Sequence, residues 1–186
     1  MTLTATIHAR RSIKEFTSKP IAPAEIERLL DAAAQAPNHR LTQPWRFYVL
    51  GPAARRAFGE ALGRRKAKRV ESPEAAAAVI AKVADAHAAL PAFLVVATVL
   101  DDTPEIREED YAATMMAVQN LCLAAHDAGL GTHIKSGAVM DDPDARAAFG
   151  VKDGERVIAM IELGEPARVP DAKLRKSAKE LTTWMP

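Results

Sequence analysis

The chain has 186 residues, of which 48% are hydrophobic and 26% charged, and its formal net charge is +1. This length supports one sizeable hydrophobic core and is short for two, so we expect a single domain over residues 1–186. The composition excludes a disordered chain, and a charge so close to zero argues against a protein that binds nucleic acid or an anionic membrane.

The cysteine and histidine content excludes several kinds of site. One cysteine, Cys122, rules out an intramolecular disulfide and a cysteine-rich metal site. The histidines show no H-E-x-x-H or other ligand-like pairing, so we expect no bound metal. The N-terminal segment lacks the apolar core of a signal peptide, and no apolar run reaches the roughly 20 residues that span a bilayer. We therefore expect a cytoplasmic protein that does not enter a membrane.

Proline and glycine divide the chain into helices and strands. A short helix is expected over residues 2–10, with Thr2 or Thr4 as its N-cap. Pro23 opens a second helix, in which apolar residues recur at the i, i+3, i+4, i+7 spacing of one buried face. Pro37 ends this helix, because the residue before a proline is pushed out of the helical region.

The middle of the chain also contains both strands and helices. Residues 46–50 are rich in aromatic and branched side chains, which predicts a strand. A helix with a basic end is expected over about 52–68, followed by an alanine-rich helix that Ser72 caps and Pro73 opens. Residues 93–100 form a nearly continuous apolar run, which is typical of a strand buried on both faces.

The longest helix is expected over residues 108–128, with small side chains that allow a partner helix to approach and Gly129 as its terminator. Next we expect a short strand over 132–135, a short helix between Asp142 and Gly150, and a buried strand over 156–163. The basic segment 167–186 has too few apolar residues to pack on its own. It is either disordered or wrapped on something else, for which a second subunit is one candidate.

Two groups of residues are suited to an anionic ligand. Arg10-Arg11-Ser12, at the end of the first helix, offers two guanidinium groups and a hydroxyl for a phosphate, although a solvated basic helix end also explains this triplet. Arg175 lies in the tail near Lys173 and Lys176, where solvated charge is the simpler interpretation.

Two further groups are suited to a flat heteroaromatic ligand. In the loop from Ala36 to Trp45, the side chains of Asn38, His39 and Gln43 can donate to the edge of a ring. The segment 129–137 has glycines that permit close backbone approach, and Lys135 adds positive charge, although a plain helix-to-strand turn is the alternative. Its spacing does not match a phosphate-binding loop.

Taken in their order along the chain, the four groups resemble the flavin-binding motifs of the nitroreductase family of FMN enzymes. The opening RRSIKEF looks like the flavin-phosphate motif, and APNH with QPWRF, residues 36–39 and 43–47, looks like the second motif. The turn 129–132 is similar to the third, and Arg175 falls where the family has a late basic residue. The match spans nearly the whole chain and most resembles the compact minimal nitroreductases.

The resemblance implies an α+β fold with a central, mostly antiparallel sheet flanked by helices. It also implies an intertwined homodimer with FMN at the subunit interface and with residues 167–186 as an arm that packs on the partner. The implied activity is ping-pong: NADPH or NADH reduces the flavin and leaves, and a small oxidised acceptor such as a nitroaromatic or a quinone follows. Flavin N5 carries the hydride, so no side chain is needed as acid or base.

The resemblance also implies roles for individual residues. Arg10, Ser12 and Arg175 would hold the phosphate, with Arg11 at the phosphate or ribityl chain. The segment 134–136 would approach the pyrimidine edge, and its lysine would stabilise negative charge near N1. The expected cofactor contacts are Arg10, Arg11, Ser12, Gln35, Pro37, Asn38, His39, Gln43, Ile134, Lys135, Ser136, Gly137 and Arg175.

The resemblance assigns Gln35 and His39 to the other subunit's flavin. His133 and Ile134 stand where the family has small residues, which would narrow the acceptor site.

Three alternatives stay open at this point. The same fold serves flavin storage, oxygen-dependent flavin chemistry or dehalogenation. These functions need specialised lids, and the sequence of residues 64–91 does not indicate one. A helical dimer that binds nucleic acid through the basic run 64–69 is disfavoured by the net charge of +1. The last alternative is a structural dimer that is not an enzyme.

Overall fold

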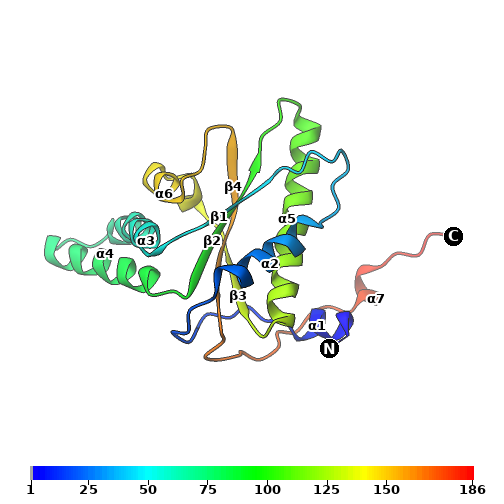
Figure 1. Ribbon diagram of the computed structural model, residues 1–186, viewed down its shortest axis with the longest axis horizontal. Coiled ribbons are helices and arrows are strands. Elements are labelled where there is room, and N and C mark those ends of the chain that lie inside the picture. The colour runs from blue at the N-terminus through cyan, green and yellow to red at the C-terminus, as the bar shows by residue number, and fades with distance from the viewer. Residues whose placement is uncertain (1) are drawn as a thin grey trace.

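In the computed structural model, which describes residues 2–186, a four-stranded sheet has helices on both faces (Figure 1). The strands are β1 (Trp45–Val49), β2 (Ala92–Val99), β3 (Gly131–Lys135) and β4 (Glu155–Gly164). They lie in the order β1-β2-β4-β3, and every pairing between them is antiparallel. The expected α+β class and its central antiparallel sheet are confirmed.

Two long helices cover one face of this sheet. These are α2 (Pro23–Ala34) and α5 (Pro104–Asp127), and the short helix α1 (Leu3–Ala9) packs against α5. Leu29 of α2 and Leu121 of α5 are buried in one apolar cluster with Leu94 and Ile161 of the sheet. Each such side chain contributes roughly 1.5–3 kcal/mol by leaving water, so this layer is a principal source of stability.

The other face carries α3 (Pro52–Ala67), α6 (Pro143–Phe149) and the 3-10 helix η1 (Ala138–Asp141), with α4 (Pro73–Ala88) packed on α3. The ring of Phe58 lies 5.1 Å from that of Phe93 and 5.0 Å from that of Phe149, centroid to centroid. A Cβ on Gly59 would lie 2.6 Å from Ala84 Cα. Glycine there therefore lets α3 and α4 approach backbone to backbone, as a hairpin that extends away from α5 (Figure 1).

Several helices begin or end at the capping residues that the sequence provides. The hydroxyls of Thr2 and Ser72 accept hydrogen bonds from the amides of Ala5 and Ala75, as N-caps do. Gly150 closes α6 in the left-handed region at φ 72°. The expected elements are confirmed within one or two residues, with one exception.

The exception is the start of α5, which begins at Pro104, four positions before the expected start at residue 108. The acidic run at 108–110 therefore lies inside the helix and not at its head. Asp110 is buried, and its carboxylate accepts a hydrogen bond of 2.5 Å from the Thr42 hydroxyl.

The C-terminal segment leaves the body beside α1 and extends outward (Figure 1). Its amide at Ala167 donates to the Glu15 carbonyl at 2.9 Å, and beyond this point it holds only the short helix α7 (Ala178–Leu181). Trp184 is 89% exposed. None of the helices within residues 2–186 combines the length and the apolar character needed to cross a bilayer.

Candidate functional site

A cavity of about 760 Å³ lies between the end of α1 and the C-terminal segment. Its lining includes Arg10, Arg11, Ser12 and Arg175, so the fold brings together, from opposite ends of the chain, the residues expected at a phosphate. Six lysine or arginine side chains and two carboxylates line it in all. Its volume falls within the roughly 300–1,000 Å³ of small-molecule sites.

The positive charge of this cavity is largely uncompensated. Of its six cationic side chains, only Arg168 forms an ion pair within residues 2–186, with exposed Glu15 at 3.9 Å. The Arg11 guanidinium donates to the carbonyls of His8 at 2.7 Å and Arg10 at 3.0 Å, and so caps the C-terminal end of α1. Arg10 and Arg175 have no such partners in the described chain, which leaves their guanidinium groups available to an anion.

The glycine-rich turn before β3 lies against the same segment. The Ile13 amide donates to the Thr132 carbonyl at 2.9 Å, and Ser12 forms a parallel bridge with Thr132. A Cβ on Gly131 would lie 2.5 Å from Ile13 Cγ1, so only glycine permits this approach. Residues 10–12 and the turn 129–132 are therefore neighbours, and a second cavity of about 260 Å³ is lined by residues of both.

Beyond Thr132, β3 has one open edge. It is the last strand of the sheet, and its other edge pairs with β4. The Thr132 carbonyl points outward to Ile13, and main-chain groups two positions apart on a strand point the same way. The amide and carbonyl of Ile134 therefore point to this open edge, and within residues 2–186 no other segment pairs with them there. Such an edge is suited to the alternating donors and acceptors of a heteroaromatic ring.

The side chains of β3 point elsewhere. The Lys135 ammonium donates to Glu162 Oε1 at 2.6 Å, and His133 Nδ1 lies 2.9 Å from Glu162 Oε2. Glu162 is only 7% exposed. Burial by itself would raise the pKa of Glu162, but the hydrogen bonds and positive charge of Lys135, together with His133, hold this pKa below its ordinary value.

The loop between α2 and β1, from Ala36 to Pro44, is held by hydrogen bonds between its own residues. Asn38 Oδ1 accepts a hydrogen bond from the Gln43 amide at 2.7 Å, and the Asn38 carboxamide also contacts the Thr42 hydroxyl at 3.2 Å. Leu41 and Gln43 have positive φ values of 52° and 46°, a region that non-glycine residues rarely occupy. Strain of this kind persists where the surrounding bonds hold it, and it concentrates at functional sites.

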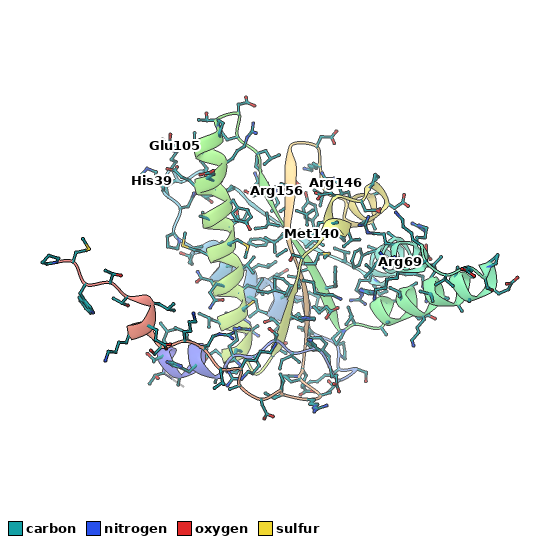
Figure 2. All side chains as sticks on the ribbon, turned by 180° about the vertical axis from the view of Figure 1, so that it is seen from behind. His39, Arg69, Glu105, Met140, Arg146 and Arg156 are labelled. Carbon is teal, nitrogen blue, oxygen red and sulfur yellow. The ribbon has the colours of Figure 1, made fainter. Side chains whose placement is uncertain are left out.

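The tip of this loop is separated from the cavity within one chain. Thr42 contacts Asp110 of α5, whereas Gln119 of α5 lines the cavity, and these nine positions correspond to about 14 Å. Figure 2 shows His39 and Glu105 at one end of α5, with α1 at the other. The structure therefore places Pro37, Asn38, His39 and Gln43 in one loop, with all but Asn38 exposed. Gln35 is also exposed but lies nearer the middle of α5, because its amide donates to the Ala32 carbonyl, which in turn accepts from the Asn120 side chain.

The basic run at 64–69 is partly neutralised. Arg64 pairs with Asp144 at 2.8 Å, and Arg65 pairs with Asp142 at 3.4 Å. Both acids belong to the start of α6, so these cations connect α3 to α6. This arrangement gives no support to a nucleic-acid-binding surface.

Comparison with known proteins agrees with this architecture. The profile of the nitroreductase family matches residues 7–165. YfhC of Bacillus subtilis (strain 168), provisionally named an NAD(P)H nitroreductase, is 34% identical over 180 residues, which cover 96% of this chain and 92% of YfhC.

Two solved structures show the same fold. A nitroreductase-like family protein from Bacillus cereus superposes with a TM-score of 0.85 at 28% identity, covering 100% of this chain and 96% of that one. A nitroreductase with bound FMN from Bacteroides fragilis NCTC 9343 has a TM-score of 0.76 at 20% identity, covering 100% of this chain and 99% of that one. From the arrangement of its sheet, helices and motifs, and from these matches, the chain belongs to the nitroreductase family.

Proposed function

We propose that this chain is an FMN-dependent NAD(P)H oxidoreductase that works as a homodimer, with FMN held at the subunit interface. The proposal rests on one observation: the expected flavin-binding residues of a single chain lie in two separate places. The later half of the long helix lies beside an anion cavity, which adjoins the open edge of β3, and its start lies beside a polar, exposed loop. Each is half of a site, and two copies related by a two-fold axis would bring unlike halves together.

The cavity and the strand edge fit FMN in order along its length. Arg10, Ser12 and Arg175 would hold the phosphate. Ile134 lies two residues beyond Thr132, which adjoins the cavity, and this span of about 7 Å is comparable with an extended five-carbon chain and the atom attached at each of its ends. The open main-chain groups of Ile134, followed by Ser136 and Gly137, would then meet the pyrimidine edge of the ring.

FMN, when bound, supplies the redox chemistry: hydride passes from NADPH or NADH to the ring and then, after the nicotinamide leaves, to a small oxidised acceptor such as a nitroaromatic or a quinone. The residues of this chain bind and orient the ring. In the proposed dimer, Gln35 and His39 of the partner subunit complete the site, while the loop geometry set by Asn38 holds Gln43 in place.

Exposed apolar side chains support the dimer. Tyr111 and Met116 of α5 are each 41% exposed, and Ile7 of α1 is 50% exposed. Within the C-terminal arm, Leu174 is 100% exposed and Trp184 89%. Side chains of this size gathered on one helix layer and an extended arm are typical of a surface that a second subunit covers. We infer that residues 1–186 form a single domain whose C-terminal arm, 167–186, packs on the partner.

The test uses purified protein incubated with FMN and then desalted. We expect retained flavin absorption, bleaching by NADPH or NADH without oxygen, and a mass of two chains by light scattering. Protein that retains no flavin would overturn the proposal. Retained flavin that neither donor bleaches would favour flavin storage or another reductant over the oxidoreductase.

A further inference from the structure

Three polar side chains meet on the sheet next to the proposed ring site. His133 and Lys135 lie two positions apart on β3, so they point to the same face, and Glu162 is paired with His133 on β4. The Glu162 carboxylate bridges the two, at 2.6 Å from the Lys135 ammonium and 2.9 Å from His133 Nδ1. This is the face on which α3 and α6 pack, and not the open edge of β3.

The charges of this cluster are determined by its burial and contacts. The side chain of Glu162 is 9% exposed and that of Lys135 29% exposed, so water screens the pair only weakly. The lowered pKa of Glu162 means that the carboxylate is ionised at neutral pH. An ionised carboxylate can only accept hydrogen bonds, so His133 Nδ1 carries a proton. The ionised Glu162 carboxylate and the Lys135 ammonium therefore form an ion pair with no net charge.

We propose that Glu162 is a positioning residue of the flavin site, which draws the Lys135 ammonium over β4 and cancels its charge, so that bound FMN is harder to reduce. The inference rests on the proposed function, in which the main chain at 134–136 meets the pyrimidine edge. Reduction places negative charge near N1 of the ring, and a free cation nearby would favour the reduced form. An ion pair presents only a dipole there, and the field of a dipole falls off faster than that of a charge.

The expected size follows from Coulomb's law. Removal of one negative charge at about 10 Å, with an effective dielectric constant of about 20, changes an equilibrium constant by about tenfold. Glu162→Gln keeps the shape of the side chain and removes its charge. We therefore expect the preference for reduced over oxidised FMN, as a ratio of affinities, to be about tenfold larger in the variant than in the wild type. This corresponds to a midpoint potential about 30 mV higher for a two-electron couple.

Glu155→Gln is the matched control. Glu155 is also on β4, 8% exposed, and hydrogen-bonded to Tyr48, but seven positions away, or about 23 Å along the strand. Loss of its charge should leave the potential of bound FMN unchanged. An equal shift of the potential in both variants would mean that loss of any buried carboxylate of β4 changes the potential through the stability of the protein. That result would overturn the inference.

A double-mutant cycle that combines Glu162→Gln with Lys135→Met separates the effect of charge from that of packing. Lys135→Met leaves Glu162 uncompensated and should lower the midpoint potential, whereas the double variant should return close to the wild type, because both charges are gone. If Glu162→Gln alone does not fold, the comparison of Lys135→Met with the double variant still measures the Glu162 charge.

The midpoint potential of desalted, FMN-loaded protein, measured by spectroelectrochemistry, is the readout. A wild type that retains no flavin would overturn the proposed function, and this inference with it. Retained flavin with a potential that Glu162→Gln does not raise would overturn this inference alone.

Discussion

Arg10→Ala tests whether the cavity beside α1 is a phosphate site. Arg10 lines this cavity, and within residues 2–186 its side chain has no acidic partner, so the guanidinium is free for phosphate oxygens. A hydrogen bond to a charged group contributes roughly 1.5–3 kcal/mol. We therefore expect Arg10→Ala to raise the Kd for FMN by about 10- to 150-fold, at about 1.4 kcal/mol for each tenfold change.

Riboflavin makes this test specific, because it has the ring and the ribityl chain but no phosphate. Fluorescence titration of the wild type and Arg10→Ala with both ligands should show a loss confined to FMN, and a smaller loss at high salt. Arg56→Ala, which removes an exposed arginine paired with Asp85 at 2.6 Å on α3, should bind both ligands like the wild type. Equal loss of FMN and riboflavin affinity, or unchanged FMN affinity, would refute the phosphate assignment.

Three further perturbations test other parts of the structure. Gly131→Ala would place a Cβ 2.5 Å from Ile13 Cγ1, so we expect urea denaturation to show a loss of about 1–3 kcal/mol. Glu27→Ala, on the exposed face of α2, should show almost none, and equal losses would contradict the close approach. Burial lowers the pKa of His87, despite the hydrogen bond to the Val83 carbonyl, so as pH falls below about 6.5 the unfolded chain takes up a proton that the folded chain resists. Stability should therefore fall from pH 7.5 to pH 5, and His87→Gln should reduce this fall; an unchanged fall would locate the effect elsewhere. Deletion of residues 167–186 removes Arg175 and the arm and should abolish flavin retention, and a truncated chain that remains an FMN-bound dimer would contradict the role of the arm.

Short-range signals predicted most of the secondary structure. Asp142 at the N-cap, Pro143 at the first position and Gly150 after the last residue are local signals, and α6 lies where they predict it. The apolar run of β2 predicted a strand buried on both faces, and all but its last residue are buried. These features need only neighbours in sequence, because capping and burial patterns act within one turn or one strand.

The start of α5 shows how such a signal is missed. Thr103 and Pro104 stand at the N-cap and first helical positions, and Glu105 lies in the first turn. The first turn is polar and faces solvent, so it lacks the apolar periodicity that predicts the rest of the helix. Pro104 was the available signal for the correct start.

The site was predicted in its parts and not in its arrangement. Arg10, Arg11, Ser12 and Arg175 were grouped by resemblance, and the structure brings them to one cavity. Nothing local indicated that Arg11 also caps α1, because a long flexible side chain has several carbonyls within reach.

Glu162 was missed altogether. It stands in an apolar strand, 27 positions from Lys135, and has no neighbour in sequence that suggests an ion pair. Only the register of β3 against β4 brings the two together, and a shift of one residue would turn Glu162 to the opposite face.

The sequence by itself therefore determined the helices and strands, their caps, the family and the chemical types of the site residues, because these depend on residue identity and short-range spacing. The tertiary structure decided which charges are free and which are paired: Arg10 faces a cavity without a partner, whereas Lys135 is neutralised by Glu162. It also decided that Thr42 of the loop lies near the start of α5, whereas the cavity reaches Gln119 in its later half. Distances between remote segments follow from strand register and helix packing, which no local pattern specifies.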